Sequence, residues 1–433
     1  MQQTAQRELT AYEQTIRDLS DRLVEAQRPI RILDAIKWDD EVQREFFARG
    51  GKEQPKVSPE FYQNRPLSFD PEAKRREIHE LERDVVAQLG QFNVVGNTLR
   101  RMCQEYQLVV RMLECRGTPE FSDLSQELYG SANDVFHAGD PRLVDLGEMM
   151  GAALANIQDS NALPDEEKSI DAATAVEILQ ERLSRVFCHD NETVRVMISD
   201  GIVADAAAGT DYIKIRNDAR FSQRELHLLE VHEGWVHVGT TLNGMRQPVC
   251  TFLSKGPPSS TVTQEGLALL MEIVAFASYP QRVRKVTNRI RAVAMAESDA
   301  TFRDVYQFFL EQGYSENESY LNSSRVFRGS LPDSGPFTKD VSYSKGFVLV
   351  YNFVQLAVRK GLLQRIPLLF AGKVTLEDMR VMSQLLDEGL IEAPRYLPPQ
   401  FRDLQGLTAW MCYSNFLNQL NLKQIEADYA GIL

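Results

Sequence analysis

The chain has 433 residues, of which 48 are basic and 61 acidic, and its formal net charge is −13. Its length allows two or three domains or one large fold, and its 43% hydrophobic content is ordinary for a globular protein. Because the chain is acidic overall, we expect it to bind neither nucleic acid nor an anionic membrane surface.

The N-terminal segment, MQQTAQRELTAYEQTIRDL, has no apolar stretch of the kind found in a signal peptide. The five cysteines are scattered and contain no C-x-x-C pair, so we expect free thiols rather than a disulfide framework. The most apolar long run, GFVLVYNFVQLAV, is too short to span a bilayer. These features predict a soluble, cytoplasmic protein.

Residues 1–165 are predicted to form a helical N-terminal region. Apolar side chains recur at helical spacing over 8–26, over 72–92, and over 28–50, where the pattern ends at two glycines. The intervening residues 50–72 are rich in proline and polar side chains, so we expect an irregular surface connection there.

Residues 166–433 are predicted to form a second region with a small sheet. After a predicted helix over 169–187, the stretch 193–200, TVRVMISD, alternates apolar side chains with polar or flexible ones, as a half-buried strand does. The turn dipeptide Asp200-Gly201 predicts a turn, and the following stretch, IVADAAAGTDYIKI, predicts further strands. We expect about three short strands in an antiparallel sheet.

Two helices are predicted to follow the sheet. The first covers residues 222–242, with Ser222 as its N-cap and Glu225 completing a capping box. The second, TVTQEGLALLMEIVAFA, comes after a proline-containing loop and is expected to be capped by Thr261 or Thr263.

Everything after about residue 280 is predicted to be helical, except for a Gly/Pro/Ser-rich break over 327–340. The pattern as a whole indicates an α+β fold that is predominantly helical. In this fold the small antiparallel sheet lies beside a central pair of helices.

The stretch VHEGWVHVGT contains the most informative pattern, because His232 and His237 are five residues apart and Glu233 follows the first. On an ideal α-helix this spacing separates two side chains by about 140°, against about 40° for i,i+4 spacing. A π-bulge would bring both imidazoles to one face, and Gly234 lowers the cost of that distortion. The pattern therefore fits a metal site on an irregular helix, or two unrelated histidines on a regular one.

A catalytic zinc site needs a third protein ligand and one position left open for water. Glu265, in the first turn of the next helix, is the candidate, and Gly266 would let the two helix backbones approach closely. Glu233 has the position of the glutamate that takes a proton from the metal-bound water in H-E-x-x-H peptidases. The ordinary alternative is that Glu265 only interacts with the helix dipole. His227 is close in sequence, but we expect it not to be a ligand.

HEGWVH followed by TQEGLA resembles the bacterial QEGLA-motif proteins, often described as flavohaemoglobin expression modulators. Their animal relatives are the microtubule-associated tyrosine carboxypeptidases, which remove the C-terminal tyrosine of α-tubulin. The resemblance covers roughly residues 170–390. It includes a third set of matching residues, namely Arg328, Gly329, Phe337, Lys339, Asp340, Tyr343 and Gly346.

The resemblance implies that residues 166–433 form a zincin-like metallopeptidase core. His232, His237 and Glu265 would bind one Zn²⁺ per chain, and Glu233 would be the catalytic glutamate. The implied activity is that of a carboxypeptidase that acts on a peptide or protein C-terminus ending in tyrosine or an acidic residue. Gln264 places the chain in the bacterial branch, so tubulin itself is not the expected substrate.

Three further residues are candidates for the reaction. The tetrahedral intermediate needs a donor beside the metal, and we assign this role to Tyr343, with Arg328 and Lys339 as alternatives. A carboxypeptidase must also bind a terminal carboxylate, and Arg328 and Lys339 are the natural cations for it. The alternative is that both are surface residues.

Other residues have weaker assignments. Glu272 lies two turns after Glu265 and could contact a ligand histidine. Trp235 is expected to pack rather than to react. The strand DYIKIR could bind an extended substrate along its edge, or it could be an ordinary strand that lines a core.

Two other functions fit the same three ligands. Two histidines and a carboxylate also describe a mononuclear iron(II) oxygenase, although such an enzyme has no use for a base at Glu233. The metal could also be structural in a non-enzymatic regulator, although structural zinc sites normally have four protein ligands. The sequence leaves the oligomeric state open.

Overall fold

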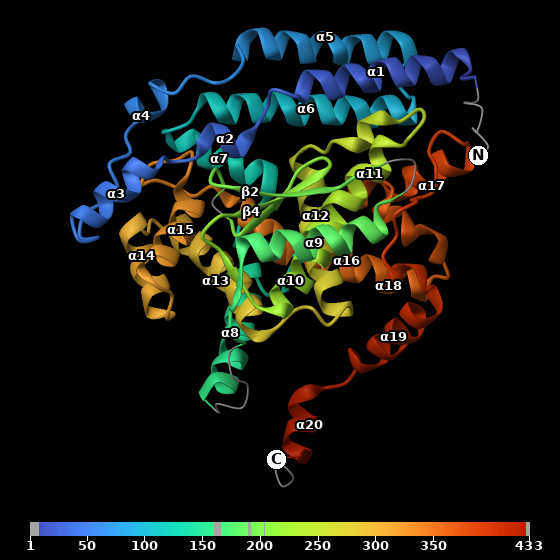
Figure 1. The fold of residues 1–433 in the computed structure, drawn as a ribbon. Helices are drawn as coiled ribbons and strands as arrows, with labels where there is room; N and C mark the ends of the chain where they lie inside the picture. Colours follow the sequence, from blue (N-terminus) through green and yellow to red (C-terminus); the bar gives the residue numbers. More distant parts are fainter. Residues whose placement is uncertain (1–7, 160–165, 189–191, 203, 430–433) are drawn as a thin grey trace.

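A computed structural model describes residues 8–159, 166–188, 192–202 and 204–429 (Figure 1). It is 65% helical and contains two small sheets, which confirms the predominantly helical α+β fold. None of the helices in these residues is long and apolar enough to cross a membrane. The five cysteines are free, as expected.

Residues 8–159 form helices without any strand. These helices are α1 (Ala11–Gln27), α2 (Ile32–Ile36), α3 (Asp40–Ala48), α4 (Pro59–Gln63), α5 (Pro71–Leu89), α6 (Val94–Glu114), α7 (Pro119–Tyr129) and α8 (Leu143–Asp159). The long helices α1, α5 and α6 lie side by side as one layer (Figure 1). The single helix predicted over 28–50 is wrong, because Asp39 accepts a hydrogen bond from the Val42 backbone and so starts α3 separately from α2.

The later part of the chain holds the remaining helices. The α-helices are α9 (Ala172–Val186), α10 (Gln223–Leu229), α11 (Gly239–Met245), α12 (Pro258–Val274), α13 (Pro280–Glu297), α14 (Phe302–Glu311), α15 (Glu316–Phe327), α16 (Val341–Arg359), α17 (Met379–Asp387), α18 (Pro399–Arg402), α19 (Leu404–Leu417) and α20 (Leu422–Tyr429). One π-helix is η2 (Glu230–Val238), and the short 3₁₀ turns are η3 (Thr251–Ser254), η4 (Thr338–Asp340), η5 (Leu363–Arg365), η6 (Pro367–Phe370) and η7 (Leu376–Asp378).

The larger sheet has three strands, as predicted, but it is mixed. Its strands are β2 (Arg195–Ser199), β3 (Ala206–Ala208) and β4 (Tyr212–Arg216), in the order β2-β4-β3, and a separate pair consists of β1 (Ile170–Asp171) and β5 (Arg220–Phe221). Because β2 and β4 run parallel, the prediction of an antiparallel sheet is wrong. Ile213 and Ile215 on β4 are completely buried in a core that they share with α9. A central strand has no free edge, so β4 is an ordinary core strand and does not bind a substrate along its edge.

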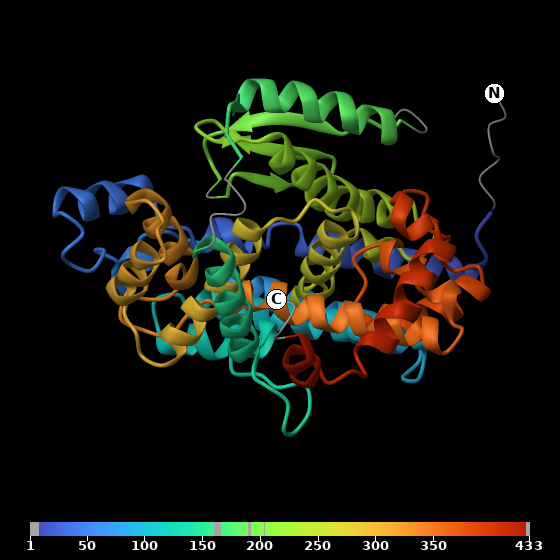
Figure 2. The ribbon, with the colours of Figure 1, turned by 90° about the horizontal axis from the view of Figure 1, so that it is seen from below.

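One continuous helix, made of α10, η2 and α11, carries both candidate histidines. The predicted capping box of Ser222 and Glu225 starts it. Val231 and Val236 face the largest hydrophobic core, and the side chain of Val238 faces a second core formed by α9 and the sheet. Figure 2 shows α9 and the sheet on one side of the molecule and the other helices on the opposite side. The histidine-bearing helix therefore packs against two hydrophobic cores.

Helix α12 packs against both the histidine-bearing helix and α16. It begins at Pro258, one turn before the predicted caps, because proline suits the first position of a helix. Glu265 is therefore about two turns into the helix rather than in its first turn. A Cβ atom on Gly266 would lie 2.0 Å from the carbonyl carbon of Gly346, so Gly266 brings α12 against α16. The prediction that it faces the histidine-bearing helix is wrong.

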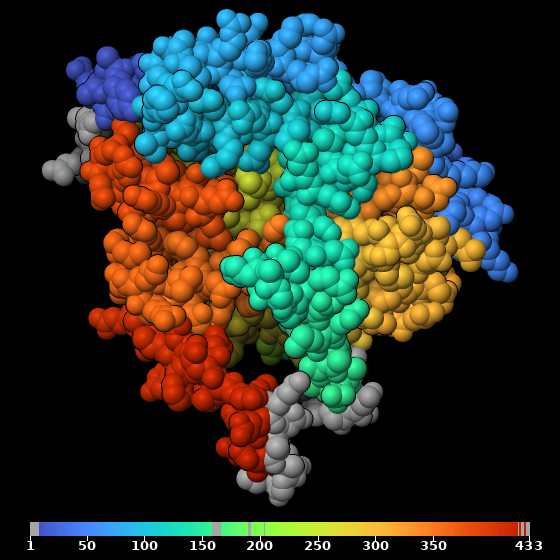
Figure 3. Space-filling view, turned by 180° about the vertical axis from the view of Figure 1, so that it is seen from behind, coloured from blue at the N-terminus to red at the C-terminus, as the bar shows by residue number. Residues whose placement is uncertain are grey.

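The largest core joins the N-terminal helices to the later ones. It contains Leu19 and Val109 of α1 and α6 together with Leu267 and Val350 of α12 and α16. Apolar packing thus continues across residue 165, where the sequence suggested a boundary between two regions. In the view from behind, α8 and the C-terminal helices project from the same end of the body (Figure 3).

Candidate metal centre

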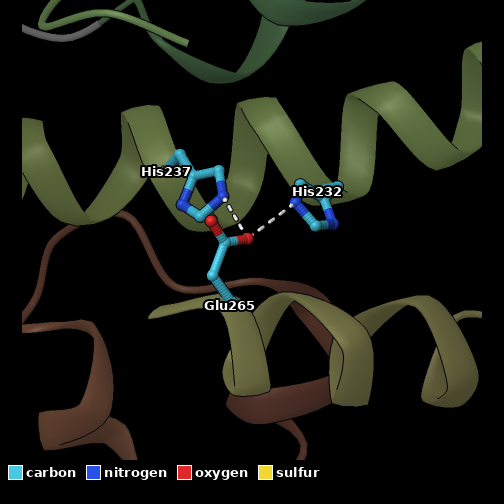
Figure 4. A group of neighbouring side chains, drawn as sticks. All are labelled: His232, His237 and Glu265. Atoms are coloured by element: carbon cyan, nitrogen blue, oxygen red, sulfur yellow. Dashed lines mark ion pairs between the residues drawn. The ribbon is translucent and has the colours of Figure 1, made fainter. Parts of the chain in front are cut away.

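The π-helix η2 brings His232 and His237 to the same face (Figure 4). A π-helix closes its hydrogen bonds between residues five apart, so side chains at that spacing stack as i,i+4 side chains do in an α-helix. The two imidazole rings have centroids 4.8 Å apart. Of the two alternatives that the spacing left open, the irregular helix is the one present.

Glu265 faces both imidazoles from α12. Its Oε2 atom is 3.5 Å from Nε2 of His232 and 3.5 Å from Nε2 of His237. Zinc–ligand bonds of about 2.0–2.2 Å at tetrahedral angles place ligand atoms about 3.4 Å apart, so this spacing suits a zinc ion. The same Oε2 is buried and has no hydrogen-bond partner, and the two imidazoles are its ion-pair partners. Among the described residues these three are the one group with metal-ligand spacing.

The other nitrogen of His232 is held by Glu272. Nδ1 of His232 lies 2.7 Å from Oε1 of Glu272, which confirms the contact predicted for Glu272. Arg282 in turn donates two hydrogen bonds to the Glu272 carboxylate, at 2.7 and 3.0 Å. A carboxylate that accepts from Nδ1–H fixes the tautomer in which Nε2 is free to bind a metal.

Burial and the neighbouring charges set the pKa values of His232 and Glu265. Burial disfavours a charge on His232, but the carboxylates of Glu265 and Glu272, with the nearby charge of Glu233, raise the pKa of His232 to about 10. Burial would raise the pKa of Glu265, but Lys339 and the two imidazoles lower this pKa well below its usual range. The site therefore holds a carboxylate whose charge attracts a cation.

Glu233 is half-buried and lies against the sheet. Its Oε2 accepts a hydrogen bond of 2.9 Å from the backbone N–H of Ala208 on the edge strand β3. This contact fixes the carboxylate next to the two histidines without making it one of the three clustered ligands. The charge of Glu233 is near enough to His232 to raise the pKa of that histidine.

A polar cluster links the end of η2 to α12. Nζ of Lys373 donates to the carbonyl of His237 at 2.9 Å, to Oγ1 of Thr240 at 3.0 Å and to Oε1 of Gln264 at 3.0 Å. Thr240 also donates to the carbonyl of Val236 at 2.6 Å. These side chains satisfy backbone carbonyls at the end of the π-helix and tie it to the residue before Glu265.

The three other predicted site residues lie nearby. The ring of Tyr343 stacks on that of His232 with centroids 6.4 Å apart. Lys339 donates a 2.9 Å hydrogen bond to Oε1 of Glu265. Arg328 is 6% exposed, so the alternative that it is a surface residue is wrong. Burial and the charge of Arg325 lower the pKa of Arg328 to about 10, which leaves the group protonated at neutral pH.

Sequence reasoning missed Arg289 on α13. Its guanidinium carbon lies 5.4 Å from the Tyr343 ring centroid, and the side chain is buried with no partner for Nε. Arg325 has two hydrogen bonds to Asp340, so that carboxylate is already occupied. Two buried guanidinium groups, Arg289 and Arg328, thus lie around Tyr343 without a carboxylate of their own among the described residues. A lone arginine within a helix carries no sequence motif that would have revealed this.

Two further predictions can be placed. His227 contacts the carbonyl of Ala275 and is not part of the cluster. Trp235 packs against Phe187 with ring centroids 5.8 Å apart, as expected for a packing residue. Lys373 was not predicted, because a single lysine in a short loop resembles any other surface lysine.

A family model described as microtubule-associated tyrosine carboxypeptidase matches residues 44–419. The match begins well before residue 170, where the resemblance noted from the motifs starts. No curated protein matches the chain.

Proposed function

The chain belongs to the microtubule-associated tyrosine carboxypeptidase family, and we propose that it is a zinc-dependent carboxypeptidase. The observation that carries the proposal is the carboxylate of Glu265. Its Oε2 is buried without a hydrogen bond, 3.5 Å from Nε2 of both histidines. His232, His237 and Glu265 would hold the zinc ion, and three protein ligands would leave one position for water.

A bound zinc ion supplies a Lewis acid that polarises a carbonyl and lowers the pKa of water. Glu233, held by its hydrogen bond from Ala208, would accept a proton from the attacking water and pass it to the departing amine. Glu272 and Arg282 keep His232 in the metal-binding orientation. We propose Tyr343, whose ring stacks on His232, as the donor to the developing oxyanion.

Recognition of a C-terminus is supported by the excess of buried positive charge. Arg289 and Arg328 have no carboxylate partner of their own, and Lys339 uses one of its three donors on Glu265. An unpaired guanidinium in a dry environment costs several kcal/mol, so a negatively charged ligand is expected there. We propose that Arg328 and Lys339 bind the terminal carboxylate, with Arg289 contributing to the same positive field.

The first experiment measures metal content by elemental mass spectrometry for the wild type and Glu265→Ala. We expect about one zinc per chain in the wild type and much less in the variant. Iron instead of zinc would favour the oxygenase, and the absence of any metal would contradict the metal centre itself.

The second experiment measures hydrolysis of peptides that end in a free carboxylate, beside the same peptides with an amidated C-terminus. We expect the wild type to release the last residue only from the free carboxylates. Glu233→Gln should keep its zinc and lose at least about a thousandfold in kcat. Zinc binding without any hydrolysis would favour the non-enzymatic regulator.

A further inference from the structure

Helices α19 and α20 carry a large apolar surface. Residues 404–422 contain no charged side chain, although 25% of the residues in the whole chain are charged. Helix α19 packs against α16, and within α19 only Leu407 and Met411 are buried. A surface helix normally turns a polar face to water, whereas α19 also turns large apolar side chains to water.

Exposed apolar side chains are concentrated on this segment. Of the nineteen large apolar side chains that are exposed in the described residues, seven lie within 410–429, namely Trp410, Tyr413, Phe416, Leu417, Leu420, Leu422 and Tyr429. Each of them is between 40% and 75% exposed. Aromatic side chains bury about 150–250 Å² each, so seven large side chains exposed to this extent offer on the order of 700 Å². A stable interface buries about 800 Å² per partner, and this segment alone supplies most of that area.

Helix α20 lacks packing partners within the chain. It has eight residues, and an isolated helix shorter than about 12 residues is only marginally stable in water. Among the described residues, no other element packs extensively against it. It projects from the body at the same end as α8 (Figure 1, Figure 3). Packing against another molecule would supply the contacts that α20 lacks.

The absence of charge indicates which partner fits this surface. A contact about a two-fold axis places side chains next to their own copies, so a charged residue there would meet the same charge. Amides and hydroxyls both donate and accept hydrogen bonds, and they can therefore pair with their own copies. The polar side chains within 404–422 are all of these two kinds, namely Gln405, Thr408, Ser414, Asn415, Asn418, Gln419 and Asn421. In a chain with a net charge of −13, this segment is the kind of surface that two copies can share without repulsion.

We propose that the α19–α20 segments of two copies of this chain pack against each other, antiparallel about a two-fold axis, to form a homodimer. Phe416 is the middle residue of 410–422 and is 64% exposed, so it would lie close to its own copy at the axis. None of these residues belongs to the metal centre. The proposal therefore does not depend on the proposed function.

Sedimentation velocity of the full-length protein tests the proposal. We expect the wild type to reach twice the mass of one chain as its concentration rises from about 1 to 100 µM. Phe416→Glu should weaken this association at least about a hundredfold, because two like charges would be brought together in an apolar interface. Phe92→Glu is the matched control and should dimerise as the wild type does, because Phe92 is 88% exposed in the connection between α5 and α6.

A pair of opposite charges tests the two-fold axis itself. Phe416→Lys alone should also be monomeric, whereas an equal mixture of Phe416→Glu and Phe416→Lys should dimerise, because opposite charges then face each other. A mixture that stays monomeric would overturn the proposed contact, and so would a Phe416→Glu variant that dimerises as strongly as the wild type. A monomeric wild type would also overturn the proposal, and its binding to phosphatidylcholine vesicles would assign the segment to a lipid surface instead.

Discussion

His232 gives the candidate centre a pH dependence of definite sign. Its pKa is raised to about 10 although it is buried, because Glu265, Glu272 and Glu233 surround it. A histidine must lose the proton on Nε2 before it binds a metal, so below this pKa zinc competes with a proton. We therefore predict that zinc affinity rises with pH by about tenfold per unit between pH 7 and 9. Competition with a chelator at each pH measures this slope.

Glu272→Gln provides the control for this prediction. The substitution removes one of the charges that raise the pKa of His232, so the rise in affinity should level off at a lower pH. The variant should also bind zinc about 10–100-fold more weakly at high pH, because the histidine loses its partner at Nδ1. A wild-type affinity that is constant above pH 7 would mean that His232 is already neutral in the metal-free protein.

At the scale of single residues, the sequence predicted groups that belong to a motif and missed groups that do not. His232, His237 and Glu265 have a diagnostic spacing, and the structure places them together. Glu272 could be suggested because helix periodicity relates it to Glu265. Arg289 and Lys373 reach the site from α13 and from a loop, and only the tertiary fold brings them there.

At the scale of elements, Lys373 should stabilise the arrangement of η2 and α12 around the metal. Burial and the charge of Lys255 lower the pKa of Lys373 to about 7. Its Nζ donates to the carbonyl of His237 and to Gln264, the neighbour of Glu265. We predict that Lys373→Met weakens zinc binding by about tenfold, since each hydrogen bond lost costs about 0.5–1.5 kcal/mol. Chelator competition would measure the affinity.

Two further variants separate positioning from a general loss of stability. Lys373→Arg should recover part of the zinc affinity, because a guanidinium can donate to the same oxygens. Lys360→Met changes an exposed lysine at the end of α16 and should leave zinc binding unchanged. If Lys373→Met bound zinc as tightly as the wild type, Lys373 would have no positioning role.

The contact between α12 and α16 depends on the absence of side chains at their crossing. A methyl group at Gly266 would lie 2.0 Å from the backbone of Gly346, which cannot move aside as a flexible side chain can. We predict that Gly266→Ala lowers the free energy of unfolding by about 3 kcal/mol or more. Urea denaturation measures the change, and Gly151→Ala in α8 is the control. Its nearest atom would be 3.9 Å away, so it should be neutral or slightly stabilising.

The elements themselves were predictable where local signals were strong. The capping box at Ser222 followed from local sequence and is present. The spacing of the two histidines left a regular and an irregular helix open, the family resemblance favoured the irregular one, and that helix is present. The order of the strands was not predictable from local signals, because it depends on tertiary packing. Strand β4, which carries the buried side chains Ile213 and Ile215, takes the central position. The predicted start of α12 was too late. A proline such as Pro258 usually indicates a loop, although it also suits the first position of a helix.

At the scale of the whole molecule, the N-terminal helices share a core and polar contacts with the later part of the chain. The segment from Gln27 to Asp34 lines a cavity of about 300 Å³ together with Lys339, and Arg17 of α1 donates a 2.8 Å hydrogen bond to the carbonyl of Pro248. The boundary that the sequence suggested at residue 165 separates two patterns of secondary structure. Whether it also separates two folding units depends on the apolar packing that crosses it.

The fragment 166–433 tests this point. Leu267 and Val350 pack in the same core as Leu19 and Val109, so the fragment would expose the apolar faces of α12 and α16 to water. We predict that the full chain unfolds in one cooperative transition and that the isolated fragment aggregates without a cooperative transition. Calorimetry and tryptophan fluorescence during urea denaturation measure both.

A full-length chain with a protease site inserted after residue 165 is the matched control. If the shared core holds the halves together, the cleaved chain should elute from a sizing column at the volume of the intact protein and keep its zinc. A fragment 166–433 that folds cooperatively and binds zinc by itself would contradict the prediction. That outcome would make residue 165 a true domain boundary and would show that the metal centre folds without the N-terminal helices.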